Sequence, residues 1–453
     1  MSQNLTDFFV EGLWVKSQLI PDKVIQQAKK CLLDYIGVVI GGAKYIQEHH
    51  PAFFEAFTKD VGECSVFGTE YKTTSANAVM LNGFCAHVLE LDDGHRKGMI
   101  HLGASIISAI LAAVEIGKGS SDDVLKGVVM GYEAAVRCAC SLQPGHKIRG
   151  YHVSGTCGTI GSAVGVAFAC NFTKEQLKST LDCAVTSAAG VLEIQEEASE
   201  LKPYNLGRAA MDGLAASKMG SLSLSGPDDI LGAKRGFLSV MTDTPTCSYL
   251  TDFSNDDYCI EGIYQKLYAA CRHCHPAIEA AIVIRKDFNI LPEKIIKIEI
   301  HTYKLAVGSH DHVQIQGISS AKLSTPFSVA LGIVKGNAEF ADFNDENLED
   351  RSVKLLSKKI TVIEDKELTS LSPQVRGARV IIYMKNGEVF EKEVLYPKGE
   401  PENPLTMQEV EDKFRKLALF RGLSIAECNM AIGELQKKTF NASRVFRILC
   451  RKW

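Results

Sequence analysis

Apolar residues in the first half of the chain are spaced as on one face of an α-helix. Residues 22–40 follow Pro21 and carry apolar side chains close to an i, i+3, i+4, i+7 stripe. Six further segments show the helical pattern and are rich in Ala, Gly and Cys: 75–87, 104–117, 121–139, 158–170, 173–189 and 209–221. Small residues let helix backbones approach closely, so we expect a compact helical bundle.

The pattern changes near residue 258. Residues 295–302 alternate apolar and polar side chains, as in a strand, and 360–362 indicate another. Residues 380–384 and 389–394 flank Asn386-Gly387, which predicts a two-residue hairpin. Helical patterns return at four segments, 276–288, 326–335, 407–419 and 425–436.

These patterns predict a mainly α protein with an α+β part. The chain has 453 residues, which favours two domains. We expect an all-helical domain from residues 1–260 and 396–453, because the helical tail rejoins the first half. Residues 261–395 then form a smaller α+β domain.

Composition and charge exclude several classes of protein. The net charge is −4 and 23% of residues are charged, so no basic face for nucleic acid is expected. The first residues lack the basic and apolar regions of a signal peptide, and the longest apolar stretch, 106–116, is too short for a membrane span. We therefore expect a cytoplasmic protein with no membrane partner, whose 14 scattered cysteines stay reduced.

Two glycine- and histidine-containing segments could carry chemistry. In residues 90–101, paired Asp92 and Asp93 precede His95 and His101, a set that suits a metal, a proton-transfer site or a polar loop. In residues 150–161, His152 precedes a glycine-rich helix start, which suits either an anion site or a tightly packed helix. The glycine spacing does not fit a dinucleotide site.

The segment Cys271-Arg-His-Cys-His275 has the spacing of a haem attachment motif or of half a zinc site. Haem attachment needs export, and no second ligand pair is evident in the sequence. We therefore expect neither group.

Cations and histidines gather in the polar motifs although the chain is mildly acidic. A fold that brings them together would suit a small polyanion. They are His95, Arg96, Lys97, His101, His146, Lys147, Arg149, His152, Lys202, Lys266, Arg272, His273 and His275.

The same motifs resemble the MmgE/PrpD family, in order and along essentially the whole chain. They are Leu-Asp92-Asp93-Gly-His with His101, the Tyr151-His152 block, Leu201-Lys202-Pro-Tyr-Asn-Leu-Gly-Arg, Lys266 with Cys271 and His275-Pro, Ala321-Lys322 with Ser324 and Pro326-Phe327, and Gly399-Glu-Pro-Glu-Asn-Pro404. The resemblance implies a helical domain built from both chain ends, an α+β lid and an active site between them. It also implies a homodimer with no metal and no organic cofactor.

The resemblance also implies the site residues. The predicted catalytic residues are His101, His152, Lys202, Asp93 and Cys271, and the predicted substrate-binding residues are Lys266, Glu90, Asp92, Tyr151, His275 and Lys322. The family's decarboxylases align a histidine with Cys271 and a threonine with Gly94, and both departures weaken a decarboxylase assignment.

The expected chemistry is proton transfer next to a carboxylate of a small polycarboxylic acid. Lys202 and Lys266 would anchor carboxylates, and His101 and His152 would move protons. A dehydratase-type lyase similar to 2-methylcitrate dehydratase is the first expectation. The alternatives are an epimerase similar to iminodisuccinate epimerase, a decarboxylase similar to cis-aconitate decarboxylase, and a non-catalytic binding protein.

Overall fold

The computed structural model describes residues 4–117, 123–196, 199–308 and 310–450. Contacts divide the chain into two compact units. Unit 1 comprises Met1–Ile194, Leu201–Tyr264 and Thr406–Trp453, and unit 2 comprises Gln195–Glu200 and Gln265–Leu405. The domain boundaries expected at residues 260 and 396 stay predictions. The molecule is mainly α with an α+β part, as the sequence predicted.

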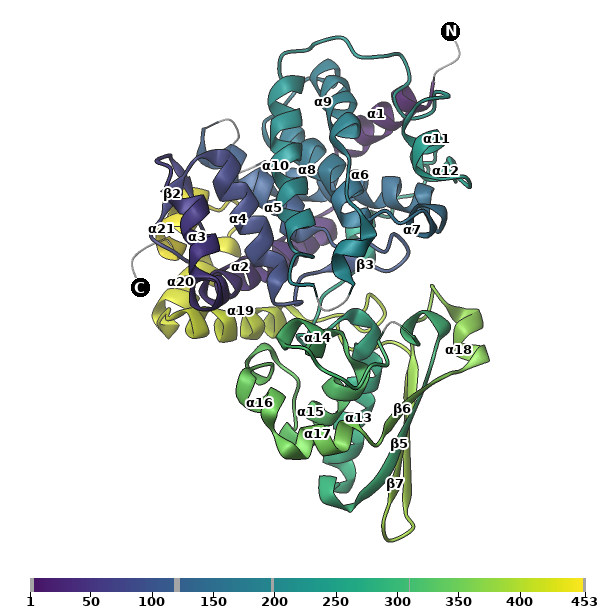
Figure 1. The fold of residues 1–453 in the computed structure, drawn as a ribbon. Coiled ribbons are helices and arrows are strands. Elements are labelled where there is room, and N and C mark those ends of the chain that lie inside the picture. The colour runs from purple at the N-terminus through teal and green to yellow at the C-terminus, as the bar shows by residue number, and fades with distance from the viewer. Residues whose placement is uncertain (1–3, 118–122, 197–198, 309, 451–453) are drawn as a thin grey trace. The chain divides into compact units, whose positions relative to one another are not determined.

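Helix α8 (Val153–Ala169) is the centre of unit 1, and every one of its side chains is buried. It packs against α5 (Gly103–Glu115), α6 (Val124–Leu142), α9 (Lys174–Ser187) and α10 (Tyr204–Gly220) (Figure 1). The prediction that this helix begins at residue 158 is wrong by five residues. Its first turn is glycine-rich but surrounded by other helices, and tertiary packing overrides the low helix propensity of glycine. Residues 121 and 122, predicted to begin the helix before it, lie outside the described residues.

Glycines let α6 and α8 approach closely. A Cβ atom added to Gly131 would lie 2.8 Å from the carbonyl oxygen of Gly161, and one added to Gly161 would lie 2.8 Å from that of Gly131. A side chain at either position would therefore push the helices apart. The glycine-rich segment after His152 serves helix packing, one of the two roles that its sequence left open.

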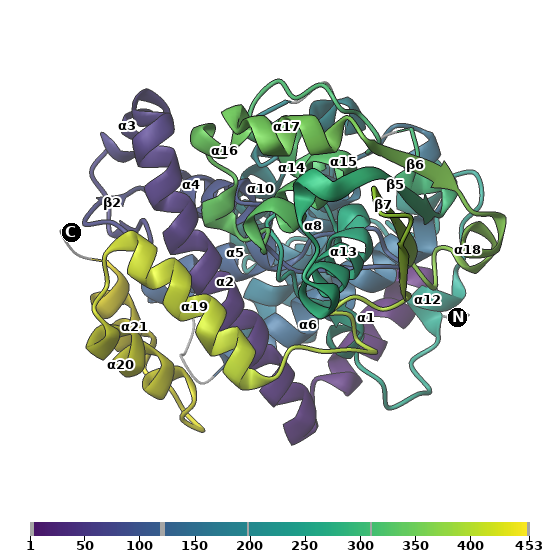
Figure 2. The same ribbon diagram turned by 90° about the horizontal axis from the view of Figure 1, so that it is seen from below.

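The two ends of the chain meet in unit 1. Helix α19 (Met407–Arg421) lies alongside α2 (Asp22–His49), which Figure 2 shows in yellow and purple. The buried Lys413 ammonium lies 2.7 Å from Oδ1 of Asp34 and donates a 2.7 Å hydrogen bond to the Leu91 carbonyl. The C-terminal tail thus fixes the turn that follows α4. The remaining helices of eight or more residues in unit 1 are α1 (Leu5–Lys16), α3 (Pro51–Thr58), α4 (Ser75–Val88), α20 (Ile425–Leu435) and α21 (Ala442–Leu449).

Unit 2 holds a four-stranded sheet in the order β6-β5-β7-β8. Strand β5 (Ile295–Thr302) pairs parallel with β6 (Ile360–Glu364) and antiparallel with β7 (Ala378–Met384), which pairs antiparallel with β8 (Val389–Val394). Buried and half-buried positions alternate along β7. Helix α13 (His275–Phe288) packs against β7 and β8, and α15 (Thr325–Lys335) packs against α13 and against α17 (Arg351–Ser357). The predicted strands are confirmed.

The β7–β8 hairpin has a three-residue loop, so the prediction of a two-residue turn is wrong. The Met384 backbone N–H donates to the Glu388 carbonyl, and the Gly387 N–H donates to the Met384 carbonyl. Asn386 therefore stands inside a four-residue turn that Gly387 closes with a φ of 89°. Glycine adopts this left-handed conformation without a Cβ clash, which suits the bulge that ends three-residue hairpin loops.

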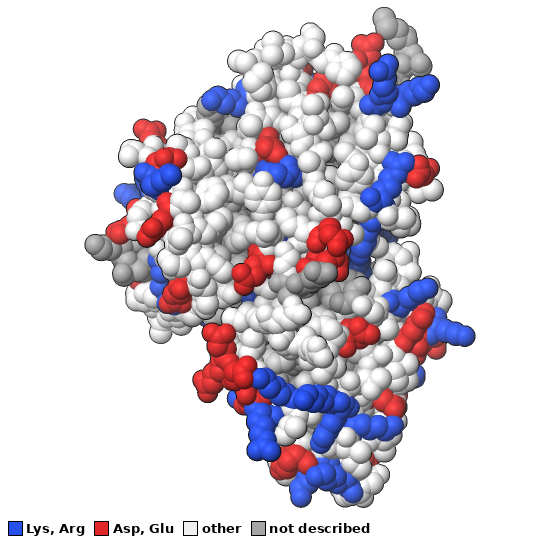
Figure 3. All heavy atoms as spheres, viewed as in Figure 1, with Lys and Arg blue, Asp and Glu red and all other residues white. Residues whose placement is uncertain are grey.

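Charge of neither sign dominates the face drawn in Figure 3, where basic and acidic side chains are interspersed. None of the described helices is both long and apolar enough for a membrane span. No disulfide joins the described cysteines.

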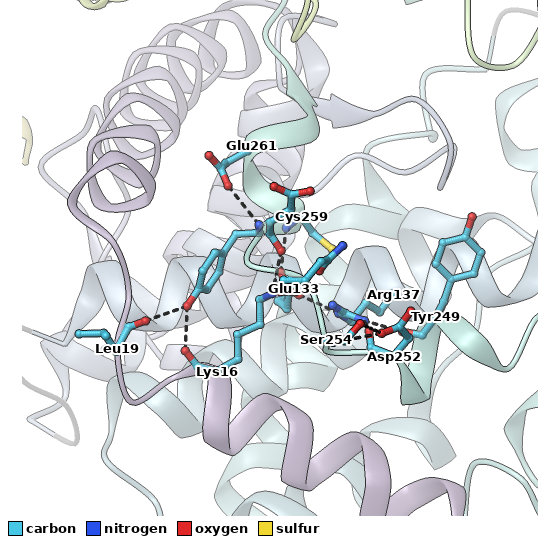
Figure 4. A network of polar contacts seen from close by, with 12 residues as sticks. Lys16, Leu19, Glu133, Arg137, Tyr249, Asp252, Ser254, Cys259 and Glu261 are labelled. Atoms are coloured by element: carbon cyan, nitrogen blue, oxygen red, sulfur yellow. Dashed lines mark hydrogen bonds and ion pairs between the residues drawn. The ribbon is translucent and has the colours of Figure 1, made fainter.

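A buried charge network joins three segments of unit 1 (Figure 4). The Glu133 carboxylate on α6 accepts hydrogen bonds from Nε of Arg137, at 2.7 Å, and from the backbone N–H of Cys259, at 2.8 Å. The Lys16 ammonium, at the end of α1, lies 3.6 Å from Glu133. These side chains are at most 8% exposed, so water screens their charges little. The Glu133 carboxylate is therefore the counter-charge of two buried cations.

Changing Glu133 to Gln should destabilise the protein strongly. The amide can still accept from Cys259, but Arg137 and Lys16 lose their buried counter-charge, which typically costs ~3–5 kcal/mol. The matched control is Asp243→Asn, which breaks the surface pair with Arg149 and should cost less than ~1 kcal/mol. Urea unfolding measures both variants, and equal losses of unfolding free energy would contradict this role for Glu133.

Candidate active site

The turn after α4 carries three of the predicted site residues. Helix α4 ends at Val88, and Glu90 has a φ of 54°. Glutamate rarely adopts this left-handed conformation, and such outliers collect at functional sites. The turn leads through Asp92 and Asp93 to the short strand β3 (Gly94–His95), which pairs with β4 (Ile263–Tyr264).

Asp92 is a buried carboxylate between two histidines. Its Oδ2 atom lies 2.8 Å from Nδ1 of His87 and 3.3 Å from Nδ1 of His101. Burial alone would raise the pKa of Asp92, but His87 and His101 outweigh it and hold this pKa well below its usual range. Asp92 is therefore ionised at neutral pH and orients both rings.

Asp93 fastens the start of α5. Its carboxylate accepts a 2.8 Å hydrogen bond from the Gly103 N–H and a 2.6 Å bond from the Tyr132 hydroxyl on α6. Burial raises the pKa of Asp93 to about 6, against these two bonds. Both carboxylate oxygens are thus engaged in holding helices together.

The backbone of Asp93 sets the tautomer of His101. Its carbonyl oxygen lies 2.9 Å from Nδ1 of His101. A carbonyl only accepts, so Nδ1 carries a proton, and in the neutral ring the lone pair is on Nε2. The His101 side chain is 15% exposed, so this lone pair belongs to a ring that small molecules can reach.

His152 has the opposite tautomer. It is the N-cap residue of α8, and the side-chain amide nitrogen of Asn205, on α10, lies 2.9 Å from its Nδ1. The amide N–H donates, so Nδ1 accepts and the ring proton is on Nε2. Burial, and after it the charge of Lys202, lowers the pKa of His152 well below its usual value. His152 is therefore a neutral N–H donor.

Lys202 and Glu90 form a buried ion pair just before α10 begins. The nearby His87 is fully buried, and its Nε2 lies 3.6 Å from Oε1 of Glu90. Within the described chain, no hydrogen bond reaches this Nε2 atom. Burial lowers the pKa of His87 to about 4, with a further contribution from Lys202 and against the effect of Asp92. His87 is therefore neutral as well.

One cluster in unit 1 thus unites five of the predicted residues. The Ser154 hydroxyl, in the first turn of α8, accepts a 3.0 Å hydrogen bond from the His101 backbone, which ties the two histidine segments together. His87, His101 and Lys202 all act electrostatically on His152. The five are Glu90, Asp92, His101, His152 and Lys202.

The fold does not bring together all the cations and histidines that were named from the sequence. Arg149 pairs with Asp243 at the surface. His146 is buried, with its Nδ1 3.1 Å from the Met241 carbonyl, and its ring stacks on that of Tyr151 at 4.7 Å. The cluster in unit 1 contains two carboxylates beside one lysine, so its cationic character is low.

The other predicted residues lie in unit 2. Lys266 is fully buried, and the Cys271 N–H donates a 2.8 Å hydrogen bond to the Lys322 carbonyl. Both ring nitrogens of His275 are engaged, at 2.8 Å from NH1 of Arg272 and 3.1 Å from the Ala270 carbonyl. Their roles toward a substrate stay predictions.

His87, Asn205 and Tyr132 were not among the site residues predicted from the sequence. The sequence held a signal for two of them. His87 stands five residues before Asp92 at the predicted end of a helix, and Asn205 lies inside the motif that contains Lys202. The sequence contains no signal for Tyr132, because only the fold brings this residue of α6 close to Asp93.

Among the residues that the structure describes, two groups of side chains have the spacing for a metal ion. His87, Asp92 and His101 each offer one ligand atom within 4.8 Å of the others, and Cys271, His273 and His310 do the same in unit 2. In the first group the positive charge of Lys202 acts on His87, and it disfavours a second cation there.

Comparisons with known proteins identify the family of this chain. The MmgE/PrpD N-terminal domain matches residues 7–250, and the MmgE/PrpD C-terminal domain matches residues 268–430. The cis-aconitate decarboxylase-like protein oryM of Aspergillus oryzae is 26% identical, over 89% of each chain. Cis-aconitate decarboxylase of Mus musculus is 22% identical, over 92% of this chain and 87% of its own. That of Homo sapiens is 21% identical, over 92% and 88%. This chain belongs to the MmgE/PrpD family.

Proposed function

We propose that the protein is a hydro-lyase that removes water from a small hydroxylated polycarboxylic acid of the citrate type. The observation that carries the proposal is the opposite hydrogen bonding of two imidazoles: Nδ1 of His101 donates to a backbone carbonyl, whereas Nδ1 of His152 accepts from a side-chain amide. Elimination of water needs one base and one acid at the same time.

The proposed reaction uses each group once. Nε2 of His101 takes the proton from the carbon next to a carboxylate, and the electron pair forms the new carbon–carbon double bond. The leaving hydroxyl takes the Nε2 proton of His152 and departs as water, which leaves His152 as an imidazolate that the positive charge of Lys202 stabilises. His101 then returns its proton to solvent, and His152 takes one back.

Charge near the carboxylate controls the barrier. The carbanion places more negative charge on a group that is already anionic, so a cation beside it stabilises the transition state. We assign this role to Lys202, whose ammonium has three N–H donors and gives one to Glu90. Asp92 and Asp93 orient the histidines. Further substrate contacts are proposed for Tyr151 in unit 1 and for Lys266, Cys271, His275 and Lys322 in unit 2.

Decarboxylation of cis-aconitate is the second candidate, because the curated relatives carry that name. Two features speak against it. Decarboxylation needs only an acid after CO2 leaves, which gives the base no role. In addition, a Cβ atom on Gly94 would lie 2.4 Å from the Tyr264 hydroxyl oxygen, so the threonine of the family's decarboxylases does not fit here without a shift of that ring.

NMR in D2O with citrate, 2-methylcitrate and cis-aconitate tests the proposal. New alkene signals from a hydroxy acid, or hydration of cis-aconitate in reverse, would support a hydro-lyase. Loss of CO2 alone would establish the decarboxylase instead, and deuterium exchange without elimination would indicate an epimerase.

We further propose a cytoplasmic homodimer that works without metal or organic cofactor, so activity should survive dialysis against EDTA.

Removing either proton carrier should lower turnover. In His101→Gln and His152→Gln, kcat should fall by ~10²–10⁴, the usual contribution of general acid–base catalysis, while KM changes little. The control is His146→Gln, another buried histidine near α8 that has no proposed role in the reaction, and it should keep kcat close to that of the wild type. Steady-state kinetics on folded variants decide, and near-normal kcat in both site variants would refute the assignment.

The tautomer of His152 should depend on Asn205. In Asn205→Asp, the carboxylate accepts a hydrogen bond from Nδ1–H, so the neutral ring carries its proton on Nδ1 instead of Nε2 and kcat at neutral pH should fall by ~10² or more. The carboxylate also raises the pKa of His152, so activity should recover as the pH falls and both ring nitrogens become protonated.

The control for this prediction is Asn205→Ala, which removes the donor without adding a charge. It should lose activity without recovery at acid pH. Identical pH profiles for the two variants would show that Asn205 does not set the tautomer.

A further inference from the structure

His87 shares a carboxylate with His101, the base of the proposed reaction. It lies in the last turn of α4 and is fully buried. Oδ2 of Asp92 lies 2.8 Å from Nδ1 of His87 and 3.3 Å from Nδ1 of His101. One carboxylate oxygen therefore faces two imidazoles, and its shorter contact is with His87.

The contact between His87 and Asp92 is a hydrogen bond with a definite direction. Asp92 is ionised at neutral pH, and an ionised carboxylate only accepts, so Nδ1 of His87 donates. The His87 ring also packs edge-on against the His101 ring, with centroids 4.8 Å apart and an angle of 68° between the planes. His87 thus limits the positions of both the carboxylate and the second ring.

The other nitrogen of His87 adds nothing to the stability of unit 1. Nε2 lies 3.6 Å from Oε1 of Glu90, and within the described chain no hydrogen bond reaches it. A buried nitrogen without a hydrogen bond costs stability, and an apolar side chain of similar size would avoid this cost. The histidine is therefore better explained by what its Nδ1–H does than by packing.

We propose that His87 is a positioning residue, whose Nδ1–H holds Asp92 where the carboxylate can serve His101. This role rests on the proposed function. When Nε2 of His101 takes a proton from the substrate, the ring becomes cationic, and Asp92 is the anion beside it. The aspartate of a Ser-His-Asp triad stabilises an imidazolium in the same way. Because His87 is fully buried, it acts through Asp92 and not on the substrate.

Removing His87 should also change the pH dependence of the reaction. Burial raises the pKa of Asp92, but His87 and then His101 outweigh burial and hold this pKa well below its usual range. Without the His87 donor the pKa of Asp92 rises, so the carboxylate is protonated, and lost as a counter-charge, at a higher pH. The other titratable groups near the pair stay the same in such a variant. They are Glu90, Asp93, His152, Lys202 and Lys413.

Two substitutions of His87 in the full-length protein separate positioning from a merely structural role. His87→Leu removes the donor, whereas His87→Asn keeps one, because the side-chain amide can take the place of Nδ1–H. In His87→Leu, kcat should fall by about 10–100-fold, the usual effect of a displaced reacting group, while KM changes little because Lys202 still binds the carboxylate. The acid side of its kcat profile should move up by about one pH unit or more. His87→Asn should retain most of kcat and the profile of the wild type.

A double-mutant cycle tests whether His87 acts through Asp92. Asp92→Asn removes the counter-charge and lowers kcat by itself. Adding His87→Leu to Asp92→Asn should then cost less than about threefold more, because the group through which His87 acts is already lost. The matched control adds His146→Gln, a buried histidine without a proposed role, and this change should leave kcat nearly the same in both backgrounds. The substrate is whichever of citrate, 2-methylcitrate and cis-aconitate the wild type converts.

Several results would overturn this role for His87. They are an unchanged kcat and pH profile in His87→Leu, equal losses in His87→Leu and His87→Asn, and fully additive losses in the cycle. Inactivity of the wild type toward all three acids would contradict the proposed function and this role with it, whereas the other results contradict this role alone. If His87→Leu fails to fold, ¹⁵N NMR of the histidine-labelled wild type decides. We expect the His87 proton on Nδ1 at neutral pH, assigned by its loss in His87→Asn, and a proton on Nε2 alone would overturn the role.

Discussion

The connection between α4 and α5 depends on Asp93, and the geometry of the candidate active site follows from the bonds of this residue. Its carboxylate joins the first residue of α5 to Tyr132 on α6, while its backbone carbonyl fixes the proton of His101 on Nδ1. A carboxylate at a helix N-terminus accepts an otherwise unpaired N–H and interacts well with the helix dipole. The same residue thus anchors two helices and orients a ring that small molecules can reach.

Burial and one lysine charge keep the surrounding imidazoles neutral. Removing a histidine from water lowers its pKa, and the ammonium of Lys202 lowers the pKa of His87 and His152 further. Neutral rings have one donor and one acceptor nitrogen, so hydrogen-bond partners decide which side gives a proton. Asp93 and Asn205 make this choice in opposite senses for His101 and His152. Two residues of the same type can therefore serve as base and acid because their hydrogen-bond partners differ, a backbone carbonyl for His101 and a side-chain amide for His152.

The sequence predicted the elements well where periodicity is long and uniform. Residues 295–302 were expected as a strand and form β5 with the same bounds. The predictions failed at two places that contain glycine, since the helical segment was expected from residue 158 and Gly387 was expected in a two-residue turn. Burial of the first turn of α8 decided the first case, and backbone hydrogen bonds around Met384 decided the second.

The candidate site was predictable as a set of residue types but not as a geometry. The motifs point to His101, His152 and Lys202, yet they say nothing of the Asn205 amide or the Asp93 carbonyl, which give the rings their different protons. Such pairings depend on tertiary contacts between distant segments, which one sequence does not encode in its local pattern.

The central claim is that the hydrogen-bond partners place the ring proton of His101 on Nδ1 and the ring proton of His152 on Nε2. Neutron diffraction from crystals grown in D2O near neutral pD locates each ring deuteron directly. The account predicts a deuteron on Nδ1 alone in His101 and on Nε2 alone in His152. Deuterons on the same nitrogen of both rings, or on all four nitrogens, would contradict it.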